Sequence, residues 1–253
     1  MPRLDQLIVA RRLADSRTRA QRLIKNGRVT RPDTGKRLTR PGEKLADTIP
    51  LAVENDPEER YVSRAGLKLE AVLNALGKRF DGRVVLDIGQ STGGFSDCAL
   101  RFGARHVIGI EVGHGQLAPA LRNDARVSCL EGVNARALGR SQAFVALCRQ
   151  HPPSIAIMDV SFISQTLIVP EIAAALPAGG ELISLVKPQF ELDPAALDKR
   201  GIVRDARRYS EVRKRVTRAC EQSGLTVRHW QPSPITGSDG NREFLLHAHR
   251  QHA

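Results

Sequence analysis

Short runs of apolar residues alternate with helix-like segments over most of the chain. Five such runs lie near 83–88, 106–111, 126–130, 154–160 and 181–187. They have the length of strands, and their nearly continuous apolar character is typical of strands that are buried on both faces. Helical segments fill the stretches between them. Strands that alternate with helices form a parallel sheet covered on both sides, so the pattern predicts an α/β domain.

The last two predicted strands, near 225–230 and 242–248, are joined differently. The connection SPITGSDGN is too short for a crossover helix, so the two strands should pair antiparallel as a hairpin. A helix over 63–76, ending at Gly77, precedes the first strand. We therefore expect a mostly parallel seven-stranded sheet with an antiparallel last strand.

The first 53 residues have a different organisation. Apolar residues have helical spacing over 4–12 and 16–26, and β-prone pieces follow at 28–30 and 48–53. The polar, acidic segment ENDPEER at 54–60 is typical of a linker. We expect a small α+β domain at 1–53, a linker at 54–60 and the α/β domain at 61–253.

The charge is unevenly distributed. The chain has 39 Lys and Arg against 27 Asp and Glu, a net charge of +12. Residues 1–53 alone hold 13 of these cations and 5 of the acids, a net charge of +8. Concentration in one segment favours a nucleic-acid partner over a merely solubilising surface, with a membrane surface as the rival.

Several features point to the cytoplasm. No stretch reaches the roughly 18 apolar residues of a membrane-spanning helix, and we expect no membrane partner. The N-terminus has no apolar signal-peptide core. The four cysteines have neither disulfide-like nor metal-binding spacing, which suits free thiols in a reducing compartment.

A ligand site is expected where the first strand of the α/β domain ends. RVVLDIG runs directly into QSTGGFSDCAL, so an acid, a glycine-containing loop and a helix start follow one another. Open α/β sheets bind ligands at this edge. The spacing fits neither the dinucleotide motif nor the phosphate-binding loop. Glu111 ends the next strand, where it would accept hydrogen bonds from ribose hydroxyls or be an ordinary strand-end charge.

Two more ionisable residues end apolar strands. Asp159 follows one strand in IMDVSF, and Lys187 follows the next in LVKPQFE. The lysine alone could extend to solvent. Together the two residues indicate a polar site at the same sheet edge.

These segments carry a resemblance to a known family. RLDQLIVARRLADSRTRAQRLIKNGRV and RPGEKL resemble an S4 RNA-binding domain, and YVSRAGLKL, LDIGQSTGGF, GHGQL, MDVSFIS, LVKPQFE and GNREFLL resemble successive methyltransferase motifs. Over nearly its whole length the chain resembles the TlyA family of hemolysin-like ribosomal RNA 2′-O-methyltransferases, which are related to FtsJ-like ribose methyltransferases. The resemblance implies a Rossmann-like class I fold that uses S-adenosylmethionine (SAM). The implied substrate is a cytidine ribose in ribosomal RNA, that of 23S RNA and, for some family members, also that of 16S RNA.

The resemblance also assigns site residues. The family's Lys-Asp-Lys-Glu catalytic set falls on Lys68, Asp159, Lys187 and Glu243. Residues expected around SAM are Asp87, Gly89, Ser91, Thr92, Gly93, Gly94 and Phe95, with Glu111 on the ribose and Asn134 near the adenine. For RNA phosphates the candidates are Arg3, Arg17, Arg19 and Lys25, with Arg64 near the active-site entrance.

Three residues depart from the family pattern. Gln90 stands where a small residue is usual, Glu111 replaces the commoner Asp, and Gln165 follows VSFIS. None of the three removes a catalytic group. Gln90 would crowd the methionine part of SAM or add a hydrogen bond to it, so the departure bears on cofactor affinity.

Lys187 is the expected base for the ribose hydroxyl. A lysine acts as a base only when neutral, which burial and the nearby cation Lys68 favour and the carboxylate of Asp159 opposes. Asp159 is therefore expected to orient the lysine and the hydroxyl, with Glu243 completing the network. The alternative is a buried ion-pair cluster that braces the strand ends.

Other functions stay open at this point. A non-catalytic RNA-binding or assembly protein would bind RNA without forming a product, and a membrane-active hemolysin or a small-molecule methyltransferase are further alternatives. The histidines of the C-terminal HAHRQH are expected to be surface residues of a frayed tail, with no metal site.

Overall fold

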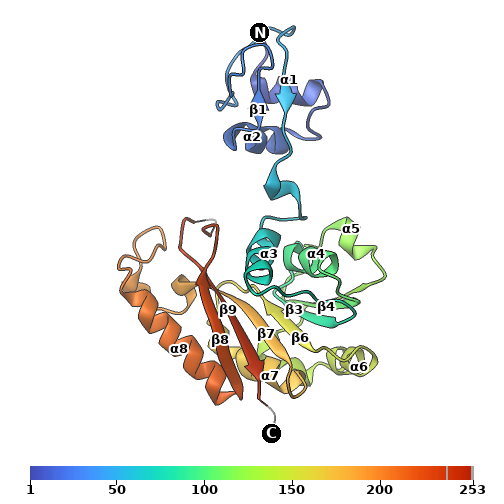
Figure 1. Cartoon of the computed structure of the whole chain (residues 1–253), viewed down its shortest axis with the longest axis vertical. Coiled ribbons are helices and arrows are strands. Elements are labelled where there is room, and N and C mark those ends of the chain that lie inside the picture. The colour runs from blue at the N-terminus through green and yellow to red at the C-terminus, as the bar shows by residue number, and fades with distance from the viewer. Residues whose placement is uncertain (238, 252–253) are drawn as a thin grey trace. The chain divides into compact units, whose positions relative to one another are not determined.

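The computed structural model describes residues 1–237 and 239–251 and divides into two compact units (Figure 1). The first unit is Met1–Arg60 and the second begins at Tyr61. Each unit is described by itself.

The first unit is small and mixes helices with a two-stranded sheet. Its elements are α1 (Leu4–Ala10), α2 (Arg17–Lys25), β1 (Val29–Thr30), β2 (Ala52–Val53) and the 3-10 helix η1 (Pro57–Glu59). The apolar faces of α1 and α2 pack together through Leu4, Ile8, Leu23 and Ile24. Ser16 caps α2 by accepting a hydrogen bond from the backbone N–H of Arg19.

Residues 54–60, where we expected a linker, lie within this first unit. They contain η1, and the carboxylate of Glu59 accepts hydrogen bonds from Arg19 and Arg22 of α2. The segment is therefore held against α2.

The second unit contains a single seven-stranded sheet. Its strands are β3 (Val84–Ile88), β4 (His106–Glu111), β5 (Val127–Glu131), β6 (Ile155–Met158), β7 (Glu181–Val186), β8 (Leu225–Pro232) and β9 (Phe244–Arg250). The strand order is β5-β4-β3-β6-β7-β9-β8, and the first five pair in parallel. The expected α/β architecture is confirmed.

Helices cover both faces of the sheet. They are α3 (Ala65–Ala75), α4 (Gly94–Arg101), α5 (Pro119–Arg122), α6 (Gln142–Gln150), α7 (Val169–Ala175) and α8 (Arg208–Gln222), and the 3-10 helices are η2 (Ala135–Arg140), η3 (Gln165–Leu167), η4 (Pro188–Phe190) and η5 (Pro194–Ala196).

Alternation along the strands creates two separate cores. Val85 packs with the residues of α3 and α4, whereas Leu86 packs on the opposite face with residues of α7 and α8. All five residues of β3 are buried, which explains their continuous apolar pattern apart from Asp87.

The antiparallel strand β9 lies inside the sheet, between β7 and β8 (Figure 1). It pairs antiparallel with both neighbours, as expected for the hairpin, and leaves β8 at the edge. Phe244 is paired with Val186, so β9 starts at the same end of the sheet at which the parallel strand β7 ends. This end is called the carboxyl edge of the sheet. No helix in the described part of the chain is long and apolar enough to cross a membrane.

Candidate active site

The loop after β3 is shaped by close backbone contacts. Gly89 has φ 81°, and a Cβ atom there would lie 2.4 Å from the carbonyl oxygen of Asp159. Only glycine fits this approach between the ends of β3 and β6. The loop then enters α4 at Gly94. It therefore lies at the carboxyl edge of the sheet, where a ligand site is expected.

Glu111, at the end of β4, organises this loop. Its Oε2 accepts a hydrogen bond from the backbone N–H of Ser91, and its Oε1 accepts one from Gly113, both at 2.8 Å. A carboxylate oxygen has two lone pairs, so each can accept a further bond from a ligand.

A cavity of about 530 Å³ opens beside Glu111. Its lining combines polar groups from Ser91, Glu111 and Asn134 with the apolar side chains of Val133 and Ile168. A carboxylate next to apolar walls suits a nucleoside, whose ribose donates hydrogen bonds and whose base needs apolar contact. Asn134 also caps η2, since its Oδ1 accepts a hydrogen bond from the Arg136 N–H at 3.0 Å.

A smaller cavity of about 130 Å³ has four lining residues in common with the first: Gly89, Ser91, Asp159 and Ser161. Its other lining residues are Ser63, Ala65, Gln90, Thr92, Gly94, Phe95 and Lys187. The two cavities therefore adjoin, and Lys187 lines the smaller one. Arg64, expected at the entrance, lies between Ser63 and Ala65 at the start of α3.

Asp87 and Gly93 line neither cavity. Asp87 is fully buried and accepts a hydrogen bond from the Ser96 hydroxyl at 2.6 Å, while Gln90 Nε2 donates to that hydroxyl at 2.8 Å. Burial raises the pKa of Asp87 to about 7, although the Ser96 hydrogen bond opposes the shift. A Cβ at Gly93 would collide with Leu121, so this glycine serves packing.

Lys187 is held by two polar neighbours. Its Nζ lies 2.6 Å from Asp159 Oδ1 and donates a hydrogen bond to Ser161 Oγ at 2.8 Å. Asp159 directly follows β6 and Lys187 directly follows the adjacent parallel strand β7, which explains their contact. The sequence prediction that these residues meet at one edge is confirmed by the fold.

Lys68 and Glu243 form a second pair. Lys68 Nζ lies 2.5 Å from Glu243 Oε2, and both side chains are buried. Phe244 pairs with Val186 at the end of the β7–β9 ladder, so Glu243 and Lys187 are the residues that directly flank its last pair. The fold thus brings the four residues of the expected catalytic set to one sheet edge as two ion pairs.

Comparison with known proteins agrees with this geometry. A model of the FtsJ-like methyltransferase family matches residues 61–250, and a model of the S4 domain matches residues 2–31. A Mycobacterium tuberculosis relative, the 16S/23S rRNA (cytidine-2′-O)-methyltransferase TlyA, is 37% identical over 250 residues, covering 96% of this chain and 88% of the relative. The chain belongs to the TlyA family.

Two further relatives support the assignment. Bacillus subtilis YqxC, whose name gives rRNA methyltransferase as a provisional activity, is 44% identical over 247 residues, covering 98% of this chain and 85% of the relative. A solved Streptococcus thermophilus structure that carries the name hemolysin is 38% identical with a TM-score of 0.75, covering 100% of this chain and 89% of that chain. Membership of this TlyA and FtsJ-like family makes the chain a SAM-dependent methyltransferase.

Two site residues of this TlyA-family chain were not anticipated from its sequence. Ser161 accepts the hydrogen bond from Lys187, and Phe162 is 91% exposed with φ 63°. A bulky residue in the left-handed region is unusual and strained, which marks a functional candidate. The Phe162 ring lies 5.2 Å from that of Phe190. Both residues lie in MDVSF, the segment from which only Asp159 is assigned a role in the sequence analysis.

Glu191 is a further unanticipated residue of this edge. It is buried and accepts hydrogen bonds from Ser164 Oγ at 2.6 Å and from the Gln165 N–H at 2.8 Å. Burial raises the pKa of Glu191. Gln165 in turn accepts a hydrogen bond from Ser184. This departure from the family pattern therefore helps to join the loop after β6 to the segment after β7.

Most of the arginines expected to bind RNA have carboxylate partners in the first unit. Arg3 and Arg17 pair with the buried Asp5, and Arg19 pairs with Glu59. Burial alone would raise the pKa of Asp5, but hydrogen bonds from Arg3, Gln21 and Arg17 hold it well below its usual range. Lys25 is exposed and has no ion pair among the described residues.

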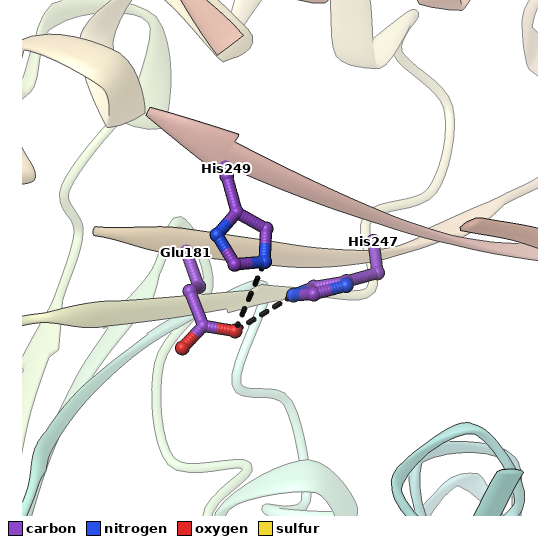
Figure 2. Close-up of side chains that lie close together, drawn as sticks. All are labelled: Glu181, His247 and His249. Carbon is purple, nitrogen blue, oxygen red and sulfur yellow. Dashed lines mark hydrogen bonds and ion pairs between the residues drawn. The ribbon is translucent and has the colours of Figure 1, made fainter. Parts of the chain in front are cut away.

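The expectation of a frayed histidine tail is wrong. His247 and His249 lie on β9, and His247 is only 3% exposed (Figure 2). Nε2 of His247 lies 2.7 Å from Glu181 Oε2, and that of His249 lies 3.7 Å from it. His252 lies outside the described residues.

The cluster is better explained as a set of polar contacts that joins β7 to β9 than as a metal site. Lys78 and Arg83 also contact the Glu181 carboxylate, each at 2.6 Å. A divalent cation would have to enter beside these two positive charges, which repel it. The cluster lies at the start of β7, at the opposite sheet edge from Lys187.

Proposed function

We propose that this chain transfers the methyl group of SAM to the 2′-hydroxyl of a cytidine ribose in ribosomal RNA. The observation that carries the proposal is the Lys187–Asp159–Ser161 cluster, because it opens into the cavity that adjoins the Glu111 pocket. The name of the M. tuberculosis relative supports cytidine 2′-oxygens of 16S and 23S RNA as the substrate class. We assign the reaction to the cytoplasm, because ribosomal RNA is its proposed substrate.

The cofactor pocket is assigned to the larger cavity. Glu111 would accept hydrogen bonds from the ribose of SAM, and Asn134 with the apolar walls would surround the adenine. Gly89, Ser91 and Thr92 would lie along the part that faces the smaller cavity. When bound, SAM supplies an electrophilic methyl group on a positively charged sulfur.

The chain's own residues have to align and deprotonate the ribose hydroxyl. Lys187 in its neutral form takes the proton at Nζ as the oxygen forms its new bond to carbon and the carbon–sulfur bond breaks. Asp159 and Ser161 fix the direction of Nζ. The Lys68–Glu243 ion pair lies where the β7–β9 ladder ends, next to Lys187 in that register. Alignment of the two reactants then contributes to the rate enhancement.

An RNA base that is unstacked from its neighbours needs another surface to contact. Phe162 offers an exposed ring at the mouth of the larger cavity. Proteins that recognise unstacked RNA bases commonly stack them on aromatic side chains. We assign this role to Phe162. Residues 1–53 would supply further RNA contacts. We assign 54–60 as the connection to the methyltransferase domain, residues 61–253.

Transfer of tritium from labelled SAM to bacterial 50S and 30S subunits, followed by nucleoside analysis, tests the proposal. We expect label in 2′-O-methylcytidine. Label on a base would contradict the ribose assignment. RNA binding and SAM binding without any transfer would instead indicate a non-catalytic RNA-binding or assembly protein. Leakage from liposomes would be required of a membrane-active hemolysin.

A further inference from the structure

Most of the positive charge of the second unit lies in one segment. Residues 61–253 have 25 Lys and Arg against 18 Asp and Glu, a net charge of +7. Residues 198–222 alone have 9 of these cations against 4 acids, a net charge of +5. The segment comprises the loop before α8 and α8 itself, and none of it belongs to the site described above.

The loop is fixed at the active-site edge. Leu197 and Val203 form an isolated bridge across it. Asn241, which is 1% exposed, accepts a hydrogen bond from the Val203 N–H at 3.1 Å and donates one to the Gly201 carbonyl at 2.9 Å. Asn241 precedes Glu243 by two positions, so these contacts attach the loop beside a residue of the expected catalytic set.

Helix α8 is anchored next to the same place. Its apolar face, which includes Val212 and Val216, is fully buried. In its first turn, the Tyr209 ring packs edge-on against Phe244, at 5.2 Å between ring centres. Residues on the opposite face, including Lys214 and Arg218, are exposed.

Six exposed cations of this segment form what we call the basic ridge: Lys199, Arg200, Arg204, Arg213, Lys214 and Arg218. None of the six makes an ion pair with a carboxylate of the described residues, whereas the neighbouring Arg207 and Arg208 pair with Asp205 and Glu211. Arg213 lies over the Trp230 ring instead. An excess of exposed positive charge without acidic partners raises the local positive potential and attracts an anionic partner.

The shape of the ridge also suits an extended anion. A hollow of about 470 Å³ runs along the outer side of α8, lined by Ser210, Arg213, Lys214, Thr217, Arg218 and Glu221. The exposed positions of α8 include no large apolar side chain, so the helix lacks the apolar face that a membrane-surface helix inserts. Arginine-rich surfaces with hydroxyl groups are typical of phosphate recognition.

We propose that the basic ridge binds the phosphate backbone of the substrate RNA while the target nucleotide occupies the active site. The inference rests on the proposed function, because it takes RNA as the substrate. The ridge gives the catalytic unit its own RNA contact, separate from any contact made by residues 1–53. It would fix the RNA strand beside Glu243 without reading its sequence.

Paired neutralisations test the ridge. The two test variants are Lys199→Gln/Arg200→Gln in the loop and Lys214→Gln/Arg218→Gln on α8. The matched control is Arg105→Gln/Arg149→Gln, which removes two exposed cations, without ion pairs among the described residues, near the starts of β4 and β6, at the opposite sheet edge. Affinity for purified 23S and 16S ribosomal RNA is measured by filter binding over a salt series, and methyl transfer is measured in parallel.

We expect each test variant to bind RNA several-fold more weakly and to raise KM for RNA, with SAM affinity and kcat unchanged. The slope of log affinity against log salt should fall by about one for each phosphate that the variant no longer neutralises. The control should change neither quantity. Wild-type affinity and salt slope in both test variants would overturn the proposal, as would an equal loss of affinity in the control.

The assay separates this proposal from the proposed function. Absence of methyl transfer by the wild-type chain would refute the function, while RNA binding would still report on the ridge. Normal binding to free RNA combined with weak binding to intact subunits would assign the ridge to a ribosomal protein and would also overturn the proposal.

Discussion

Val186 and Phe244 are paired across β7 and β9 in antiparallel register. Lys187 and Glu243 are the residues next to this pair, so two segments 56 positions apart bring two members of the expected catalytic set to the same end of the sheet. Without β9 inserted between β7 and β8, Glu243 would lie away from the ends of the parallel strands. The antiparallel strand therefore positions Glu243, one of the residues to which we assign a catalytic role.

The Lys68–Glu243 pair should matter for both activity and stability. Glu243→Gln removes the negative charge that lies 2.5 Å from the buried Lys68 ammonium. Removing one member of a buried pair costs roughly 3–5 kcal/mol. We expect a lower free energy of unfolding and a fall in kcat of about 100-fold or more. Chemical denaturation and single-turnover methyl transfer measure the two effects.

The double variant Lys68→Met/Glu243→Gln serves as the control for that prediction. Because no charge is left buried, it should recover part of the lost stability without recovering activity. Full activity in either variant would show that the pair only braces the fold.

Glu111→Ala should weaken SAM binding selectively. The substitution removes the acceptor expected for the ribose and also the two hydrogen bonds that hold the N–H groups of Ser91 and Gly113. Loss of charged hydrogen bonds of about 1.5–3 kcal/mol corresponds to a Kd increase of roughly 10- to 150-fold. Calorimetry measures it, and RNA affinity should stay constant. Glu111→Asp, with the commoner family residue, should bind SAM nearly normally.

Phe162 should contribute to RNA use but little to folding. Its ring is 91% exposed, so Phe162→Ala removes little buried surface. Stacking of one base on an aromatic ring contributes about 1–3 kcal/mol. That energy corresponds to a fall in kcat/KM for RNA of about one to two orders of magnitude. We expect SAM affinity to stay unchanged. Phe162→Tyr keeps the ring and should keep the activity; equal losses in both variants would argue against stacking.

The Glu181 cluster should make stability sensitive to acid. Burial alone would raise the pKa of Glu181, but hydrogen bonds from His247, Lys78 and Arg83 hold it well below its usual range. Folding is therefore favoured by Glu181 above its unfolded pKa of about 4.3. That contribution is lost as the pH falls from there through the lowered pKa.

Glu181→Gln should flatten this part of the pH profile. We expect the variant to be less stable at neutral pH, by roughly 1–3 kcal/mol, and to lose less stability than wild type on acidification. Urea unfolding at several pH values measures both curves. Parallel curves for the two proteins would contradict the assigned role of Glu181.

Much of the fold could be predicted from short apolar runs. Strands such as β3 and β7 are buried on both faces, so their sequences are continuously apolar and easily found. Asp159 and Lys187 could be predicted to meet because they end adjacent strands. The assignments of Lys68 and Glu243 needed the family resemblance, since their contact spans 175 positions.

Features that depend on distant partners were not predictable. The ion pair of Arg19, a predicted RNA contact, could not be foreseen, because its partner Glu59 lies 40 positions away. His247 was assigned to a frayed tail because nothing local shows that β9 continues to Arg250 inside the sheet. Phe162 was missed because its positive φ depends on how the loop after β6 folds over the site.

The most direct test of the account is methyl transfer by Lys187→Ala, measured with labelled SAM and ribosomal subunits beside a SAM-binding titration. We expect the wild-type enzyme to label a cytidine 2′-oxygen, and the variant to bind SAM with wild-type affinity but to transfer no methyl group. Retained transfer by a folded Lys187→Ala protein would contradict the assignment of Lys187 as the base.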